Sequence, residues 1–143
     1  MNMKKNISIV LIVVLLFASF AFCVLWQRAV HDKSNFEAIA QAEANETYRH
    51  FLDYQTMSDE SDYWGGVSSF YAFREAYTLL TEGTNKTANS IFCNEIYGCL
   101  LCSPERARDH ISEIIDIMEI LSDNVWNERG YLQMAELRNT LQE

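Results

Sequence analysis

The chain has 143 residues, of which only one is proline and five are glycine. So few turn-forming residues exclude a β-sandwich or barrel and favour long helices joined by short connections. The formal charge is −9, and from Ser34 onward 7 basic residues stand against 19 acidic residues, which leaves that part at −12. Because such a surface repels phosphate backbones, we expect no nucleic-acid partner.

A run of twenty uncharged residues extends from Ile7 to Trp26. A helix of that length covers roughly 30 Å, which matches the hydrocarbon core of a bilayer. We therefore predict a cytoplasmic segment at 1–6 and a transmembrane signal anchor at 7–27. Two alternatives are a signal peptide cleaved at Ser19-Phe20-Ala21 and a lipoprotein attached at Cys23, which bulky Phe22 disfavours.

The charges around the apolar run favour a cytoplasmic amino terminus. Lys4 and Lys5 precede the run, whereas Arg28 and Lys33 behind it are offset by Asp32. Cytoplasmic flanks are enriched in Lys and Arg, and a signal anchor so near the amino terminus usually exports the downstream domain. We expect a single-pass protein of the cell membrane with an extracytoplasmic, acidic carboxyl-terminal domain.

Beyond the anchor, apolar residues recur at helical spacing. The segment 28–58 is predicted to be a juxtamembrane amphipathic helix. It starts afresh at the capping box Ser34-Asn-Phe-Glu37 or runs on from the membrane. A second helix is predicted from Asp62 to Glu82, with Gly83 just past its end.

Three more helices are predicted toward the carboxyl terminus. The first covers Thr87 to about Tyr97 and stops at Gly98. The second begins at Ser103-Pro104 and extends to Leu121, and the last covers about Val125 to Leu141. Because the connections are short, we expect an all-α fold. It comprises one transmembrane helix followed by a small antiparallel bundle of about five helices, with 59–143 as the acidic helical bundle.

The second helix carries a glycine pair and an aromatic stripe. Gly65 and Gly66 mark a bend or a place where another backbone comes close. Aromatic residues at helical spacing usually fill a core, and the alternative is that they line a ligand pocket. The residues concerned are Trp64, Phe70, Tyr71 and Tyr77.

Cys93, Cys99 and Cys102 lie within ten residues of one another. In an oxidising compartment we expect one disulfide among them, with Cys99–Cys102 and Cys93–Cys99 both open. A zinc site that adds His110 is a weaker alternative, because the ligand spacing matches no known zinc module. A thioredoxin-like role for Cys99-Leu-Leu-Cys102 lacks the strand and helix setting that such folds require.

The remaining patterns give no support to catalysis. Five carboxylates line one strip of the predicted fourth helix and are interpreted as a solvated face: Glu105, Asp109, Glu113, Asp116 and Glu119. With no catalytic motif and no cofactor signature, we predict a non-enzymatic domain that acts in protein–protein interaction at the cell envelope. Its partner is a basic protein or a second copy of the chain. The alternatives are a small-molecule sensing domain and a metal or thiol site on the cysteines.

Overall fold

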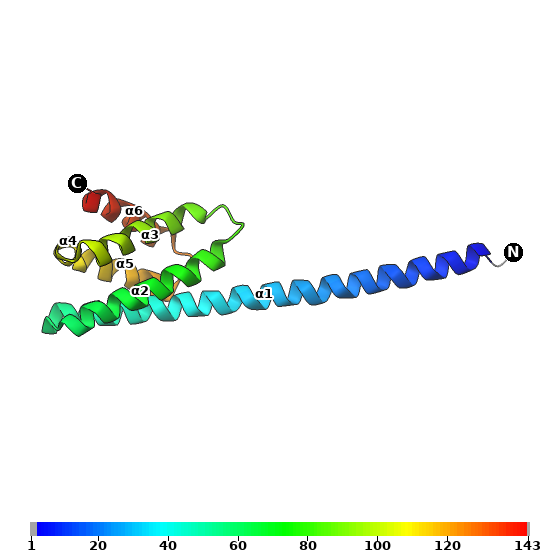
Figure 1. Cartoon of the computed structure of the whole chain (residues 1–143), viewed down its shortest axis with the longest axis horizontal. Coiled ribbons are helices and arrows are strands. Elements are labelled where there is room, and N and C mark those ends of the chain that lie inside the picture. Colours follow the sequence, from blue (N-terminus) through cyan, green and yellow to red (C-terminus); the bar gives the residue numbers. More distant parts are fainter. Residues whose placement is uncertain (1–2, 143) are drawn as a thin grey trace. The chain divides into compact units, whose positions relative to one another are not determined.

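The computed structural model describes the backbone of residues 3–142 and the side chains of residues 19–86 and 88–142. The regular elements of this part of the chain are all helices and it contains no strand (Figure 1), so the all-α prediction is confirmed. Residues up to Asn35 form one unit and Phe36–Glu143 form a second. The helices are α1 (Met3–Met57), α2 (Glu60–Thr81), α3 (Thr87–Cys102), α4 (Pro104–Asp109), α5 (Ile111–Asp123) and α6 (Glu128–Gln142).

The predicted cytoplasmic segment 1–6 and most of the predicted anchor 7–27 lie outside the residues whose side chains are described. Where side chains are described, no helix is both long enough and apolar enough to cross a membrane. The described remainder of the apolar run is helical and exposed. Phe20 is 70% exposed and Trp26 is 64% exposed, although the Trp26 ring stacks on Phe22 at 6.2 Å between centroids.

Helix α1 passes through the predicted capping box at Ser34 without a break, so the continuous alternative is correct. No glycine or proline occurs between Met3 and Met57, and nothing in the backbone therefore forces a stop. The helix ends at Met57, one residue before the predicted limit at 58. Ser58 adopts a positive φ of 57°, and its N–H donates to the Tyr54 carbonyl at 2.7 Å, which closes the last turn.

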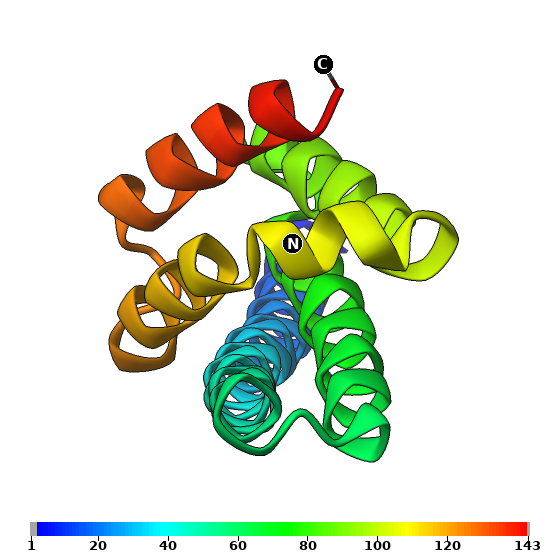
Figure 2. The same cartoon turned by 90° about the vertical axis from the view of Figure 1, so that its left-hand side faces the viewer.

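Helix α2 runs antiparallel to the second half of α1, and a short turn joins them (Figure 2). The Asp59 carboxylate caps α2 by accepting from the Ser61 N–H at 2.8 Å. The glycine pair allows close packing on α1, because a Cβ at Gly66 would lie 2.5 Å from a ring carbon of Phe51. The predicted close approach of another backbone is therefore replaced by the close approach of two side chains, those of His50 and Phe51.

Three predicted boundaries were wrong. Helix α3 continues through Gly98 to Cys102, because a helical glycine costs only about 1 kcal/mol when the flanking residues are good helix formers. The predicted single helix from Ser103 to Leu121 is two helices, α4 and α5, which break at His110. The break allows α4 to pack on α3 and α5 to pack on α6. Helix α6 begins at Glu128 rather than Val125.

The core of the second unit is aromatic around α2 and aliphatic around α5. The Tyr77 ring stacks on Tyr131 from α6 with 4.8 Å between centroids, and the Tyr63 hydroxyl donates to the Leu100 carbonyl at 2.9 Å. The largest fully buried side chains are those of Phe51, Tyr63, Phe70, Phe73, Tyr77, Leu80, Ile96, Leu100, Ile114, Met118, Leu121 and Met134. This continuous core fixes the positions of α5 and α6, which enclose the candidate site.

Candidate functional site between α5 and α6

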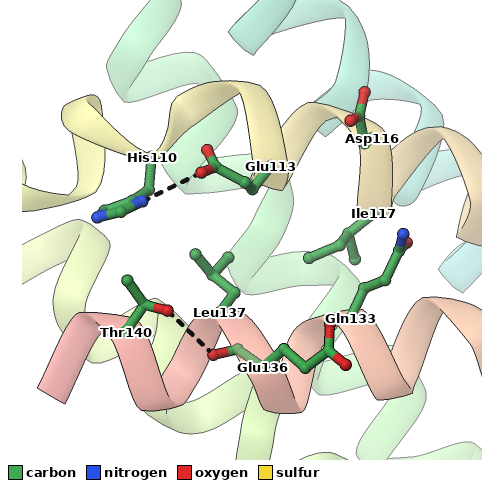
Figure 3. Close-up of a pocket in the computed structure, with 8 residues that line it drawn as sticks. All are labelled: His110, Glu113, Asp116, Ile117, Gln133, Glu136, Leu137 and Thr140. Carbon is green, nitrogen blue, oxygen red and sulfur yellow. Dashed lines mark hydrogen bonds and ion pairs between the residues drawn. The ribbon is translucent and has the colours of Figure 1, made fainter.

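A hollow of about 210 Å³ opens between α5 and α6. Ile117 and Leu137 lie between the two helices (Figure 3), and the lining carboxylates of Glu113, Asp116 and Glu136 form what we call its rim. The lining residues come from the start of α5 and the length of α6: His110, Glu113, Asp116, Ile117, Gln133, Glu136, Leu137 and Thr140. We name this feature the α5–α6 hollow.

Local hydrogen bonds hold the rim of the hollow. The Glu113 carboxylate lies 3.3 Å from Nδ1 of His110, the residue at which α4 and α5 separate. On the facing helix the Thr140 hydroxyl donates to the backbone carbonyl of Glu136 at 3.3 Å (Figure 3). The side-chain carboxylate of Glu136 takes no part in that hydrogen bond. The Gln133 Oε1 atom is buried and accepts no hydrogen bond from the described residues.

The arrangement suits an elongated cation better than a metal ion or a large organic ligand. Ile117 and Leu137 offer apolar surface to the stem of a lysine or arginine side chain, and the rim carboxylates attract its charged end. The described residues hold no group of three or more His, Cys, Asp or Glu close enough to bind a metal ion. The hollow is also smaller than the 300 Å³ or more that is typical of small-molecule sites.

No lysine or arginine is among the residues that line the hollow, and most cations of this unit make contacts between helices. The Arg74 guanidinium lies between the rings of Tyr71 and Tyr97, at 4.6 and 4.7 Å from their centroids, and so joins α2 to α3. Arg108 of α4 lies 4.6 Å from the Tyr63 ring and pairs with Glu60 of α2.

Three further cations make similar contacts. Arg138 of α6 pairs with Glu95 of α3 at 3.3 Å, and Arg106 of α4 donates to the Leu141 carbonyl at 2.7 Å. Lys86 lies 5.4 Å from the Trp126 ring. Five of the seven basic residues after Ser34 therefore bridge separate segments of the fold, whereas most of the 19 acidic residues remain on its surface.

The carboxylate strip predicted to be solvated is indeed exposed, although it runs over two helices instead of one. Sequence reasoning placed Glu113 and Asp116 on that strip but missed the hollow beside them. No local signal predicts that Glu136 of α6 lies opposite, because that pairing depends on how α5 packs against α6. The break at His110, which begins the hollow, had no glycine or proline signal either.

The four aromatic residues of the predicted stripe separate into two pairs. Phe70 and Tyr77 are fully buried, and burial raises the pKa of the Tyr77 hydroxyl above its ordinary value. Trp64 is 45% exposed and Tyr71 is 44% exposed. None of the four lines the α5–α6 hollow or a second hollow of about 400 Å³ between α3 and α6, which Phe92, Tyr131 and Leu132 help to line.

The three cysteine residues of α3 do not all lie at one place. All four thiols are free, with Cys93 buried, Cys99 half-buried and Cys102 exposed. The Cys93 sulfur points into the core, 3.5 Å from Sδ of Met134, and burial raises its pKa to about 12. Among the described residues no group of three or more His, Cys, Asp or Glu lies close enough to hold a metal ion, so the structure does not bring Cys93, Cys99, Cys102 and His110 together as the weaker zinc alternative requires.

Comparison with known proteins found no relative of this chain. No protein-family model matches the chain, and neither curated proteins nor solved structures gave a match.

Proposed function

We propose that this chain is a single-pass membrane protein whose acidic helical domain lies outside the cytoplasm and binds a basic protein partner without enzymatic activity. The α5–α6 hollow is the proposed contact site, and a lysine or arginine side chain of the partner is its proposed occupant. The observation that carries the proposal is the distribution of charge: the domain uses its cations between its own helices and leaves its carboxylates on the surface.

The membrane anchor is supported by the uncharged run Ile7–Trp26 and by the exposure of its described part. Helices that are apolar on all sides require an apolar surrounding, and a bilayer supplies it. Orientation rests on Lys4 and Lys5, which favour the cytoplasmic side. An acidic domain beside a membrane is also repelled by anionic lipid headgroups, which leaves its surface available to a protein.

The hollow can be tested with three neutral substitutions, Glu113→Gln, Asp116→Asn and Glu136→Gln, combined in one variant of the full chain. A matched control neutralises three exposed carboxylates that do not line the hollow, through Asp32→Asn, Asp53→Asn and Glu82→Gln, and has the same net charge. The probe is a fluorescent lysine-rich peptide, and the readout is its anisotropy in the presence of the detergent-solubilised chain.

Exposed ion pairs contribute about 0.2–1 kcal/mol each, so three of them correspond to a loss of about tenfold in affinity. We expect that loss in the hollow variant and a change of less than about threefold in the control, since distant charges are screened by salt. Equal losses in both variants would show that the domain attracts cations generally and has no site at the hollow.

Anchoring and partner binding are tested in cells that express the full chain. We expect the chain to stay with membranes after alkaline carbonate extraction, and its domain to be cut by protease added to intact cells. Cross-linking should recover one stoichiometric protein, and the hollow variant should recover less of it. A chain released into the medium, or one that is never cross-linked to another protein, would contradict the proposal.

A further inference from the structure

Two of the free thiols lie together at the end of α3. Cys102 is the last residue of the helix and is exposed, and Cys99, one turn earlier, is half-buried. The helix ends directly after them, because Ser103 leaves helical geometry with φ −137° and its N–H donates to the Cys99 carbonyl at 2.8 Å. Both thiols therefore belong to a terminal turn, which can adjust more readily than the middle of a helix.

Helix geometry excludes Cys93 as a partner for either thiol. Six residues separate Cys93 from Cys99, and a rise of about 1.5 Å per residue places their Cα atoms about 9 Å apart along the axis. A disulfide requires a Cα separation of at most about 6.8 Å. The distance to Cys102 is longer still, and the Cys93 side chain is sealed against Met134 in the core.

Cys99 and Cys102, in contrast, lie three residues apart on one helix face. Cβ atoms at this spacing are about 5–6 Å apart, and a disulfide brings them to about 3.5–4.5 Å. The required approach is about 1.5 Å, and it involves only the last turn of α3. The exposure of Cys102 also allows a small disulfide in solution to reach its sulfur.

We propose that Cys99 and Cys102 form a reversible dithiol–disulfide site that exchanges with small disulfides such as glutathione disulfide, while Cys93 remains reduced. The inference concerns the chemistry of these two side chains and is independent of the proposed membrane location and partner.

The exchange runs in two steps. The Cys102 thiolate, formed by loss of its proton to water, attacks one sulfur of glutathione disulfide and forms a mixed disulfide, and one glutathione thiolate leaves. The Cys99 thiolate then attacks the Cys102 sulfur, which forms the Cys99–Cys102 bond and releases the second glutathione. Two protein thiols are oxidised, one glutathione disulfide is reduced to two glutathione molecules, and the released thiolates take up the two protons.

The surroundings assign these different roles to the two thiols. Burial raises the pKa of Cys99, although the positive charge of nearby Arg106 acts in the opposite direction. Cys99 is also half-buried, so a disulfide in solution reaches its sulfur less readily than that of exposed Cys102. It lies close enough to resolve a mixed disulfide on Cys102, because that second step is intramolecular.

The test uses the full chain in detergent with Cys23→Ser, so that only the three domain thiols remain. The protein is equilibrated with mixtures of glutathione and glutathione disulfide, quenched with acid, alkylated and analysed by intact and peptide mass spectrometry. We expect the chain to lose two hydrogen atoms without retaining glutathione. Peptide mass spectrometry should locate the new disulfide between Cys99 and Cys102. The oxidised fraction should follow the ratio of glutathione disulfide to the square of the glutathione concentration.

Single substitutions distinguish the two steps. Cys99→Ser should retain one glutathione on Cys102, because no resolving thiol remains, and Cys102→Ser should retain less glutathione in the same time. Cys93→Ala should behave as the parent chain does, and circular dichroism should show that each variant is folded. A link that includes Cys93, glutathione retained on both Cys99 and Cys102 of the parent chain, or a covalent dimer through Cys102 would overturn the proposal.

Discussion

Alanine at Gly66 should destabilise the helical domain, whereas alanine at neighbouring Gly65 should not. A Cβ atom at Gly66 would lie 2.5 Å from Cε1 of Phe51, whose side chain is fully buried and has no free space to enter. A Cβ atom at Gly65 would lie 2.8 Å from the imidazole of His50, whose side chain is 37% exposed and can turn toward solvent.

The expected magnitudes combine two opposing effects. Replacing a helical glycine with alanine stabilises by about 1 kcal/mol at either position. Inserting a methyl group into a packed core costs about 1–3 kcal/mol, and a contact as short as that at Gly66 belongs near the upper end. The net loss at Gly66 is therefore about 2 kcal/mol, while Gly65→Ala should lie within about 0.5 kcal/mol of the parent chain.

Gly98 supplies the matched control. It lies inside α3, and a Cβ atom there would meet no atom within 4 Å, so Gly98→Ala should stabilise by about 1 kcal/mol. The assay is urea unfolding of the full chain in detergent, followed by tryptophan fluorescence and fitted with a common slope. If Gly66→Ala is as stable as Gly65→Ala, the close packing of Phe51 on α2 is not the reason that a glycine is needed there.

Two further predictions concern the Arg74 guanidinium and the buried Cys93 thiol. Arg74→Met should lower the unfolding free energy by about 1–2 kcal/mol, because two cation–π contacts of about 0.5–1 kcal/mol each are lost. The control is Arg49→Met, on the exposed face of α1, which should change the unfolding free energy little. Equal effects in urea unfolding would refute the role of the two tyrosine rings. Burial raises the pKa of Cys93 from 9.0 to about 12, so its neutral thiol stabilises the fold fully below pH 9.0 and the contribution is lost as the pH rises toward 12. Cys93→Ala should therefore show a smaller decline in unfolding free energy than the parent chain as the pH is raised above 9.0, and parallel declines would contradict this.

Most of the helices could be predicted because their apolar residues repeat with helical periodicity. The end of α1 at Met57 and the proline at the start of α4 were signalled by local residues alone. The prediction that α3 ends at Gly98 was wrong because a glycine ends a helix only where it adopts a positive φ. Gly83 does so, with φ of 72°, whereas Gly98 remains an ordinary helical residue.

The candidate site was less predictable than the helices. Glu113 and Asp116 are recognisable as one face of α5, but Glu136 joins them only through the packing of α6. The break at His110 is also a tertiary effect, because no residue around it disfavours a helix strongly. The three cysteine residues were grouped by their spacing in the sequence. Cys93 lies apart from the other two because α3 is one uninterrupted helix that turns Cys93 toward the core.

The use of arginine between the helices has a consequence for crowding. Since five of the seven basic residues after Ser34 make contacts between segments of the fold, the outer charge of the domain is predominantly negative, and neighbouring copies of the domain repel each other. At physiological salt this repulsion extends over about 8 Å beyond the surface. Copies of the domain should therefore stay apart when the salt concentration is low, and they should gather only where multivalent counter-ions or a cationic protein lie between them.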